Sequence, residues 1–184
     1  MRAAGATDSD QMVIRVVGDA IVHTEVNEGW AVTSLECTRG LARLDLRRDL
    51  TQVVIADTGD AEAGLGEPPA FAAAACTPDG EVVVVARRSP PAIVLGPSGC
   101  RTSPSNGADR ETAYPQPGER LLLLSSSAFE NMSDVLVSGM NVSPSALIQR
   151  DPQDLLLAIF ADLGCGAGAV IDRRPNRLPE GVGP

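Results

Sequence analysis

The sequence contains no lysine, and all 15 of its basic residues are arginines. A chain without lysine cannot form a Schiff base with a carbonyl substrate, and it cannot supply the lysine of a Walker phosphate-binding loop. Aromatic residues make up only 3% of the chain, so it lacks a platform on which single-stranded nucleic acid could stack. Schiff-base chemistry, a Walker loop and stacking of single-stranded nucleic acid are therefore excluded. With so few aromatic residues, the core must be aliphatic.

Metal-binding and nucleophilic motifs are also scarce. His23 is the only histidine, and the four cysteines are far apart, with no CxxC pair. Zinc-ligand spacing is therefore absent, and the cysteines are best interpreted as free thiols, buried or half-buried. A Ser-His-Asp triad would depend on His23 alone, and no GxSxG nucleophile motif is present. The formal net charge of −9 argues against binding to nucleic acid.

Long apolar segments are missing as well. No apolar run approaches the length of about 18 residues that a membrane-spanning helix requires, and residues 1–11 lack the apolar region of a secretion signal. We therefore expect a cytoplasmic protein without membrane association. The 184 residues suit one domain with a substantial core. We expect a flexible segment at 1–10, a single domain over 11–172 and a polar, disordered tail at 173–184.

The most informative apolar run is Leu121–Leu124, which follows a Pro-Gly turn. Four consecutive leucines are typical of a fully buried strand, and the serines after them predict a polar loop. His23–Gly29 is expected to form a polar turn, and residues 100–116 have the composition of a mobile loop. Further apolar or β-branched segments predict strands at 11–22, 30–35, 41–49, 51–56, 70–76, 81–86, 92–95 and 166–171.

Helices are few. The clearest one begins after Asp151, which can cap it, has Pro152 in its first turn and can end at Gly164. Residues 131–138 could form a short helix, and 144–149 are expected to be irregular or a single turn. The predicted class is α+β, with antiparallel, β-sandwich-like sheets and few covering helices.

Carboxylates at strand ends are the remaining source of chemistry. Asp57 follows the predicted strand 51–56 and lies in a turn beside Gly59. Glu36 or Asp45 could approach it from preceding strands, and Glu130 could approach from the segment after the leucine run. Several such oxygen ligands together could bind a divalent cation. Each of them alone is more simply explained as a solvated turn residue.

Four segments, in order along roughly residues 50 to 172, resemble one family. Residues 53–63 (VVIADTGDAEA) resemble the "vvIgDvsGhGleA" motif of metal-dependent protein phosphatases, the PPM family, in its sporulation-type and sigma-factor-regulating branch. Residues 77–95 resemble the "dpdGel…aGHpPplll" hairpin, and 117–130 are similar to "pGdrLlLyTDGltE". Residues 166–171 lie where the family has "DDaavlv". The resemblance implies a shortened version of the family's α-β-β-α fold.

The sequence departs from the family at the residues that carry its chemistry. Family members bind two Mn²⁺ or Mg²⁺ ions, and of their ligands the resemblance keeps Asp57, with Glu36 as a possible second. Ser126 replaces the acidic residue of the "TDG" motif, and Gly166 and Ala167 replace the final "DD" pair. The glycine and histidine of "GHpP" are also replaced, and most of the helical stretch after the "GhG" motif is missing.

Retained strand motifs beside lost ligands imply a pseudophosphatase that needs no cofactor and binds a protein partner, such as a regulator or kinase in partner switching. The alternative is an active Mn²⁺- or Mg²⁺-dependent serine/threonine phosphatase with unusual ligands, namely Asp57, Glu36, Asp60 and Glu130. A third hypothesis is a structural subunit of a homo- or hetero-oligomeric assembly. The shortened helical layer would leave a sheet face uncovered, and exposed apolar faces are usually buried against a partner.

Overall fold

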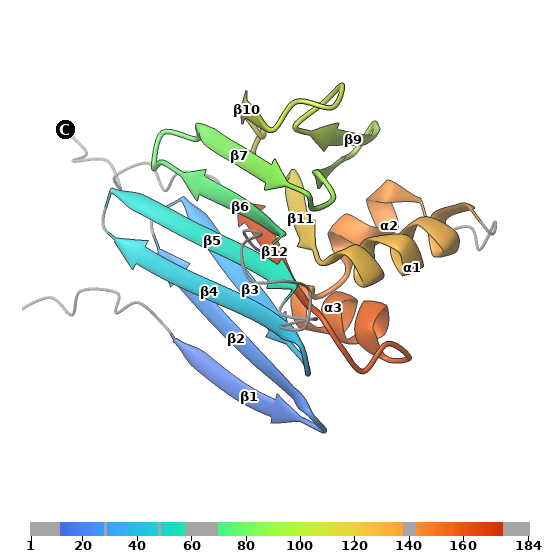
Figure 1. Ribbon diagram of the computed structural model, residues 1–184. Coiled ribbons are helices and arrows are strands. Elements are labelled where there is room, and N and C mark those ends of the chain that lie inside the picture. Colours follow the sequence, from blue (N-terminus) through green and yellow to red (C-terminus); the bar gives the residue numbers. More distant parts are fainter. Residues whose placement is uncertain (1–11, 28, 48, 58–69, 138–142, 175–184) are drawn as a thin grey trace, which may run out of the picture.

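Two antiparallel sheets pack face to face in the computed structural model, and helices cover one side of the pair (Figure 1). The structure describes residues 12–27, 29–47, 49–57, 70–137 and 143–174, with only the backbone of 133–137. One sheet has seven strands in the order β1-β2-β3-β12-β11-β8-β9, and the other has five in the order β10-β7-β6-β5-β4. The predicted α+β class with sandwich-like sheets is confirmed.

The seven-stranded sheet contains β1 (Val13–Val17), β2 (Ala20–Asn27), β3 (Trp30–Glu36), β12 (Ala167–Arg173), β11 (Arg120–Leu124), β8 (Ala92–Gly96) and β9 (Gly99–Ser103). The five-stranded sheet contains β10 (Arg110–Ala113), β7 (Val82–Arg87), β6 (Phe71–Cys76), β5 (Leu50–Asp57) and β4 (Gly40–Arg47). The helices are α1 (Ser126–Val137), α2 (Pro144–Gln149) and α3 (Pro152–Phe160).

The leucine run forms β11, which is buried on both faces as predicted. Leu121 and Leu123 belong to the core between the two sheets, whereas Leu122 and Leu124 belong to the core beneath the helices. This division follows from the alternation of side chains along a strand, with one face packed on the other sheet and one on the helical layer. β11 is therefore the strand on which both cores meet.

Three segments predicted to be loops or turns have regular structure. The serines after the leucine run begin α1 at Ser126. The predicted loop at 100–116 contains most of β9 and all of β10, where Glu111 accepts a hydrogen bond from the Ser105 backbone N–H at 2.7 Å. The predicted turn at His23–Gly29 was also wrong, because β2 continues to Asn27 beside β3. In each case long-range pairing overrides local composition.

The last strand and the helices also differ in extent from the prediction. Residues 144–149, expected to be irregular or a single turn, form α2. Asp151 caps α3 as predicted, because its side chain accepts hydrogen bonds from the backbone N–H groups of Gln153 and Asp154. β12 was predicted to end at Ile171 but continues to Arg173, which is buried. Its guanidinium lies 4.9 Å from the centre of the Trp30 ring.

The predicted flexible segment 1–10 and residues 175–184 of the predicted tail lie outside the described residues, so the proposed domain limits stay a prediction there. In the described part of the chain, no helix is long and apolar enough to cross a membrane.

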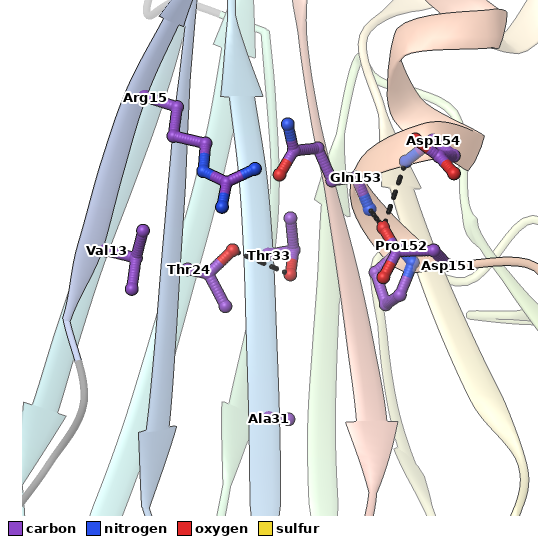
Figure 2. A pocket seen from close by; sticks show the side chains of 9 residues that line it. All are labelled: Val13, Arg15, Thr24, Ala31, Thr33, Asp151, Pro152, Gln153 and Asp154. Carbon is purple, nitrogen blue, oxygen red and sulfur yellow. Dashed lines mark hydrogen bonds between the residues drawn. The ribbon is translucent and has the colours of Figure 1, made fainter.

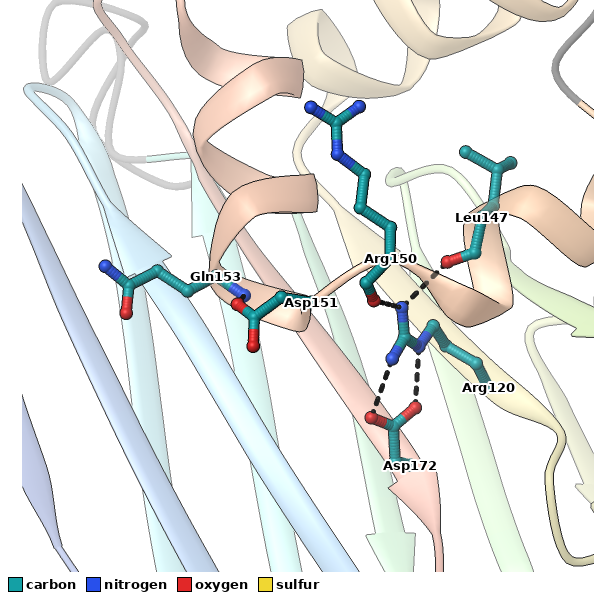
Figure 3. A network of polar contacts seen from close by, with 6 residues as sticks. All are labelled: Arg120, Leu147, Arg150, Asp151, Gln153 and Asp172. Atoms are coloured by element: carbon teal, nitrogen blue, oxygen red, sulfur yellow. Dashed lines mark hydrogen bonds and ion pairs between the residues drawn. The ribbon is translucent and has the colours of Figure 1, made fainter.

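A buried arginine joins the helices to the sheet (Figure 3). Arg120 on β11 donates two hydrogen bonds to Asp172 on β12, at 2.6 and 3.0 Å. Its remaining guanidinium nitrogen donates to the carbonyl oxygens of Leu147 and Arg150, at 2.8 and 2.7 Å. These carbonyls lie at the end of α2 and in the link to α3. One side chain therefore fixes the position of both helices over the sheet.

We expect Arg120→Leu to lower the free energy of unfolding by about 3 kcal/mol, because it leaves a partly buried carboxylate and two carbonyls without their donor. The matched control is Arg47→Leu, which removes a two-bond pair with Asp45 between side chains that are 67% and 44% exposed. That change should cost about 1 kcal/mol or less. Urea denaturation of both variants measures the difference, and equal losses would contradict the anchoring role of Arg120.

Candidate functional site

Four strand termini meet at one end of the sandwich. Glu36 ends β3 and is the cross-strand partner of Ala167, the first residue of β12. Asp57 ends β5, and its carboxylate contacts Ser126, which follows β11. We call this region the strand-end corner and define it as residues 36–40, 57, 125–127 and 165–167. It contains the two ligands that the resemblance keeps, Asp57 and Glu36, and the three positions where it replaces acidic residues, Ser126, Gly166 and Ala167.

Asp57 caps helix α1 from the opposite sheet. Its Oδ2 accepts a hydrogen bond from the Ser126 backbone N–H at 3.1 Å. Ser125 precedes the helix, but its hydroxyl is directed to β12 and accepts a hydrogen bond from the Ala167 N–H at 3.3 Å. A carboxylate is favoured at a helix N-terminus, because free amides and the helix dipole both present positive charge there. The aspartate that the resemblance assigns to metal binding therefore has a structural partner.

Glu36 is engaged in a similar way. Its Oε2 accepts a hydrogen bond from the Ala42 backbone N–H at 3.0 Å. Glu36 belongs to the seven-stranded sheet and Ala42 to the five-stranded sheet. Both carboxylates of the strand-end corner thus join the two sheets by accepting a backbone hydrogen bond from the element opposite.

The positions that replace the family's acidic pair do not have room for longer side chains. Gly166 has φ of +100°, and a Cβ there would lie 2.5 Å from the Ser125 hydroxyl oxygen. A Cβ on Gly40 would lie 2.0 Å from the Gly166 carbonyl oxygen, so the two glycines allow the backbones to touch. Ala167 is fully buried in the core between the sheets. A carboxylate at either position would require the backbone to move or a charge to be buried.

Backbone hydrogen bonds close the same region. The Cys37 N–H donates to the Gly166 carbonyl at 2.9 Å, and the Gly166 N–H donates to the Thr38 carbonyl at 3.0 Å. Burial raises the pKa of the Cys37 thiol, and the nearby Cys165, Asp19 and Glu36 raise it further. The thiol is therefore protonated at neutral pH and is a poor metal ligand.

The other acidic residues that the structure describes do not complete a cation site. Asp45 forms an exposed ion pair with Arg47 at 2.9 Å, Glu130 is exposed on α1, and Asp60 lies outside the described residues. Across the described ranges, no three histidine, cysteine, aspartate or glutamate side chains gather closely enough to hold a metal ion. A dinuclear centre for Mn²⁺ or Mg²⁺ requires several carboxylates. The residues at the strand-end corner therefore do not fit the metals that the resemblance implies.

Sequence reasoning missed Ser125 and Gly40. Ser125 lies in the segment that resembles the "TDG" motif but was given no role, and Gly40 lies outside the motifs. Their roles depend on contacts with Ala167 and Gly166 that are distant in sequence. The positive φ of Gly166 likewise has no signal beyond the glycine itself.

A separate hollow of about 470 Å³ lies on the helical side of the seven-stranded sheet (Figure 2). Thr24 and Thr33 share a hydrogen bond at 3.1 Å on its floor, and the beginning of α3 borders it. Asp151 Oδ1 already accepts the amides of Gln153 and Asp154 at 2.9 and 3.2 Å. The hollow therefore does not present a free helix N-terminus to an anion. It is lined by Val13, Arg15, Thr24, Ala31, Thr33, Asp151, Pro152, Gln153 and Asp154.

No protein-family model and no curated protein matches the sequence. Solved structures match the fold. The phosphatase domain of SpoIIE from Bacillus subtilis is 10% identical, with a TM-score of 0.55 over 86% of this chain and 99% of that one. RsbX in complex with magnesium is 8% identical, with a TM-score of 0.56 over 83% and 98%.

The RsbU and RsbW domains of a Mycobacterium tuberculosis protein are 11% identical, with a TM-score of 0.55 over 82% of this chain and 62% of that one. The chain thus has the fold of the PPM-type phosphatase domains found in SpoIIE, RsbU and RsbX. At these identities the likeness establishes the architecture and leaves the activity to be argued from the residues.

We expect Asp57→Ala to lower the free energy of unfolding by about 1 to 2 kcal/mol, because α1 loses its cap. Asp57→Asn keeps an oxygen acceptor and should cost only a few tenths of a kcal/mol. Asp45→Ala is the matched control, since that carboxylate has only an exposed ion pair. Urea denaturation measures stability, and hydrogen exchange at the Ser126 amide reports the cap directly. A loss at Asp57 no larger than at Asp45 would refute the capping role.

Proposed function

We propose that this PPM-fold domain is a pseudophosphatase that acts as a protein-binding regulatory module. The observation that carries the proposal is the state of the strand-end corner. Its two carboxylates accept backbone hydrogen bonds, and the three positions where the resemblance has acidic residues hold Ser126, a glycine with a positive φ and a core alanine. One or two carboxylates do not retain a pair of hard cations against water. The strand ends are arranged for structural support rather than for metal-assisted hydrolysis.

A binding role is supported by the surface as well as by the corner. The described helices all pack on the seven-stranded sheet, which leaves the other sheet without a helical layer in the described part of the chain (Figure 1). An antiparallel sheet can leave a polar face in water, but an exposed apolar face usually marks an interaction site. A partner protein is the simplest source of that layer here.

The comparisons suggest the kind of regulation. One matched structure joins RsbU and RsbW domains, and another belongs to the bacterial stressosome. We therefore propose that the partner is a regulator or kinase in a partner-switching system, and that the domain works in the cytoplasm. The structural-subunit hypothesis would instead have the domain assemble into a larger homo- or hetero-oligomer.

The absence of a working metal centre can be tested by calorimetric titration with Mn²⁺ and Mg²⁺ and by hydrolysis of a phosphoserine peptide. We expect no saturable heat and no hydrolysis above the rate without protein. RsbX, which has been crystallised with magnesium, is the positive control for the titration. Hydrolysis by the wild-type protein that is lost in Asp57→Ala would establish the active phosphatase instead. Asp57→Asn separates this result from loss of the helix cap, because it removes the charge and keeps the acceptor.

A further inference from the structure

The five-stranded sheet has one face packed on the seven-stranded sheet and one face turned away from it, which we call the outer face. Side chains alternate along each strand, so Val53 and Ile55 of β5 enter the core between the sheets and Val54 points outward. No described helix lies over the outer face (Figure 1). It is formed by Leu41, Arg43, Asp45, Arg47, Gln52, Val54, Ala56, Phe71, Ala73, Ala75, Val83, Val85, Arg87, Arg110 and Thr112.

The centre of the outer face is apolar and its sides are basic. Cross-strand register places Arg43, Val54, Ala73, Val85 and Arg110 in one row across five strands. The three apolar residues in the middle are half-buried by their neighbours, whereas the two arginines at the ends are exposed. The row thus runs from a positive charge on β4, across an apolar floor, to a positive charge on β10.

The adjacent row has an arginine at one end only. Leu41, Ala56 and Phe71 continue the apolar floor, and Arg87 follows on β7. Leu41 is 42% exposed, although a large apolar side chain is normally covered. None of Arg43, Arg87 and Arg110 forms an ion pair with a carboxylate of the described chain. A basic rim of this kind is notable in a chain whose formal net charge is −9.

We propose that the outer face binds an acidic amphipathic helix of a partner protein, a proposal that rests on the protein-binding function proposed above. The apolar side of the helix would cover Val54, Ala73 and Val85. Glutamate or aspartate residues along its two flanks would pair with Arg43 on one side and with Arg87 and Arg110 on the other. The partner would thereby supply for this sheet the helical layer that α1–α3 supply for the other.

The chemistry of the face favours this occupant over the others. A second copy of the chain docked by the same face would bring two arginine rims together, which is unfavourable. A lipid surface is favoured by large apolar side chains that project from a basic face, whereas the floor here consists mainly of half-buried valines and alanines. An apolar strip between basic rims is complementary to a helix with an apolar stripe and acidic flanks.

The test uses a fluorescein-labelled peptide of about 18 residues, five helical turns, with leucine and alanine on one face and glutamate on both flanks. The control peptide has lysine in place of each glutamate. Fluorescence anisotropy with the full chain should show saturable binding of the acidic peptide only, weakened by added salt because the rim charges are exposed. Chemical-shift or hydrogen-exchange changes should map to β4–β7.

Two sets of variants locate the site. Arg43→Glu, Arg87→Glu and Arg110→Glu together should weaken binding at least about ten-fold, because attraction at the rim becomes repulsion. The matched control reverses three exposed arginines elsewhere, Arg15→Glu, Arg39→Glu and Arg150→Glu, and should change affinity by no more than about two-fold.

A second, uncharged variant guards against misfolding of the first. Val54→Thr with Val85→Thr keeps shape and strand preference while adding hydroxyls to the floor, and should weaken binding several-fold. Circular dichroism and thermal unfolding establish that each variant is folded.

Several outcomes would overturn the proposal. These are no binding by the wild-type chain, equal weakening by the rim and control variants, or a dimer in light scattering that the threonine variants dissociate. Rim-dependent sedimentation with phosphatidylglycerol vesicles would assign the face to a membrane. If the acidic peptide binds only to a variant that combines Asp60→Asn, Glu62→Gln and Glu67→Gln, the outer face would be assigned to the chain's own segment 58–69. The peptide-binding assay contains no metal or phosphate, so a failure to bind the peptide leaves the pseudophosphatase proposal intact. Hydrolysis of a phosphoserine peptide would overturn the pseudophosphatase proposal alone.

Discussion

The hydrogen bond between Asp57 and the first amide of α1 joins the three layers of the domain at one point. Asp57 ends a strand of the five-stranded sheet, and the helix continues directly from β11 of the seven-stranded sheet. Glu36 makes the complementary connection by accepting the Ala42 amide across the sheets. A negative charge at this position is retained because a helix N-terminus favours it, without any cation. This contact gives Asp57 a structural role that requires no cation.

The replacements around these carboxylates form one consistent set. With Gly166 in a left-handed conformation, the backbones of residues 36–40 and 165–167 approach and exchange hydrogen bonds. Ala167 then fills the core beside them, and Ser125 uses its hydroxyl to hold the Ala167 amide. Restoring a single carboxylate would therefore have to displace several contacts at once. This closed arrangement supports the proposed pseudophosphatase role.

The two sides of the sandwich differ in how they complete their layers. On one side, Arg120 fixes the α2–α3 link and a second aliphatic core forms beneath the helices. On the other side, no described element covers the outer face, which carries valines, alanines and a rim of arginines. Because an apolar sheet face is usually buried against another layer, this asymmetry is the main support for the proposed binding role.

Local sequence determined the elements whose signals are strong at short range. The buried leucine strand, the strand before Asp57, the β4 edge strand and the capped helix after Asp151 were all predicted, because apolar periodicity and capping chemistry act within a few residues. The motif resemblance assigned Asp57, Ser126 and Gly166 to the family's ligand positions, and the structure places all three at the strand-end corner. What only the tertiary structure decided was the role of these residues. Whether a carboxylate binds a cation or caps a helix depends on which groups from distant strands lie beside it. Neither composition nor motif spacing determines those long-range contacts. The same reason explains the errors at 100–116 and after Leu124, where pairing with β7 and capping by Asp57 converted polar, loop-like sequence into strand and helix.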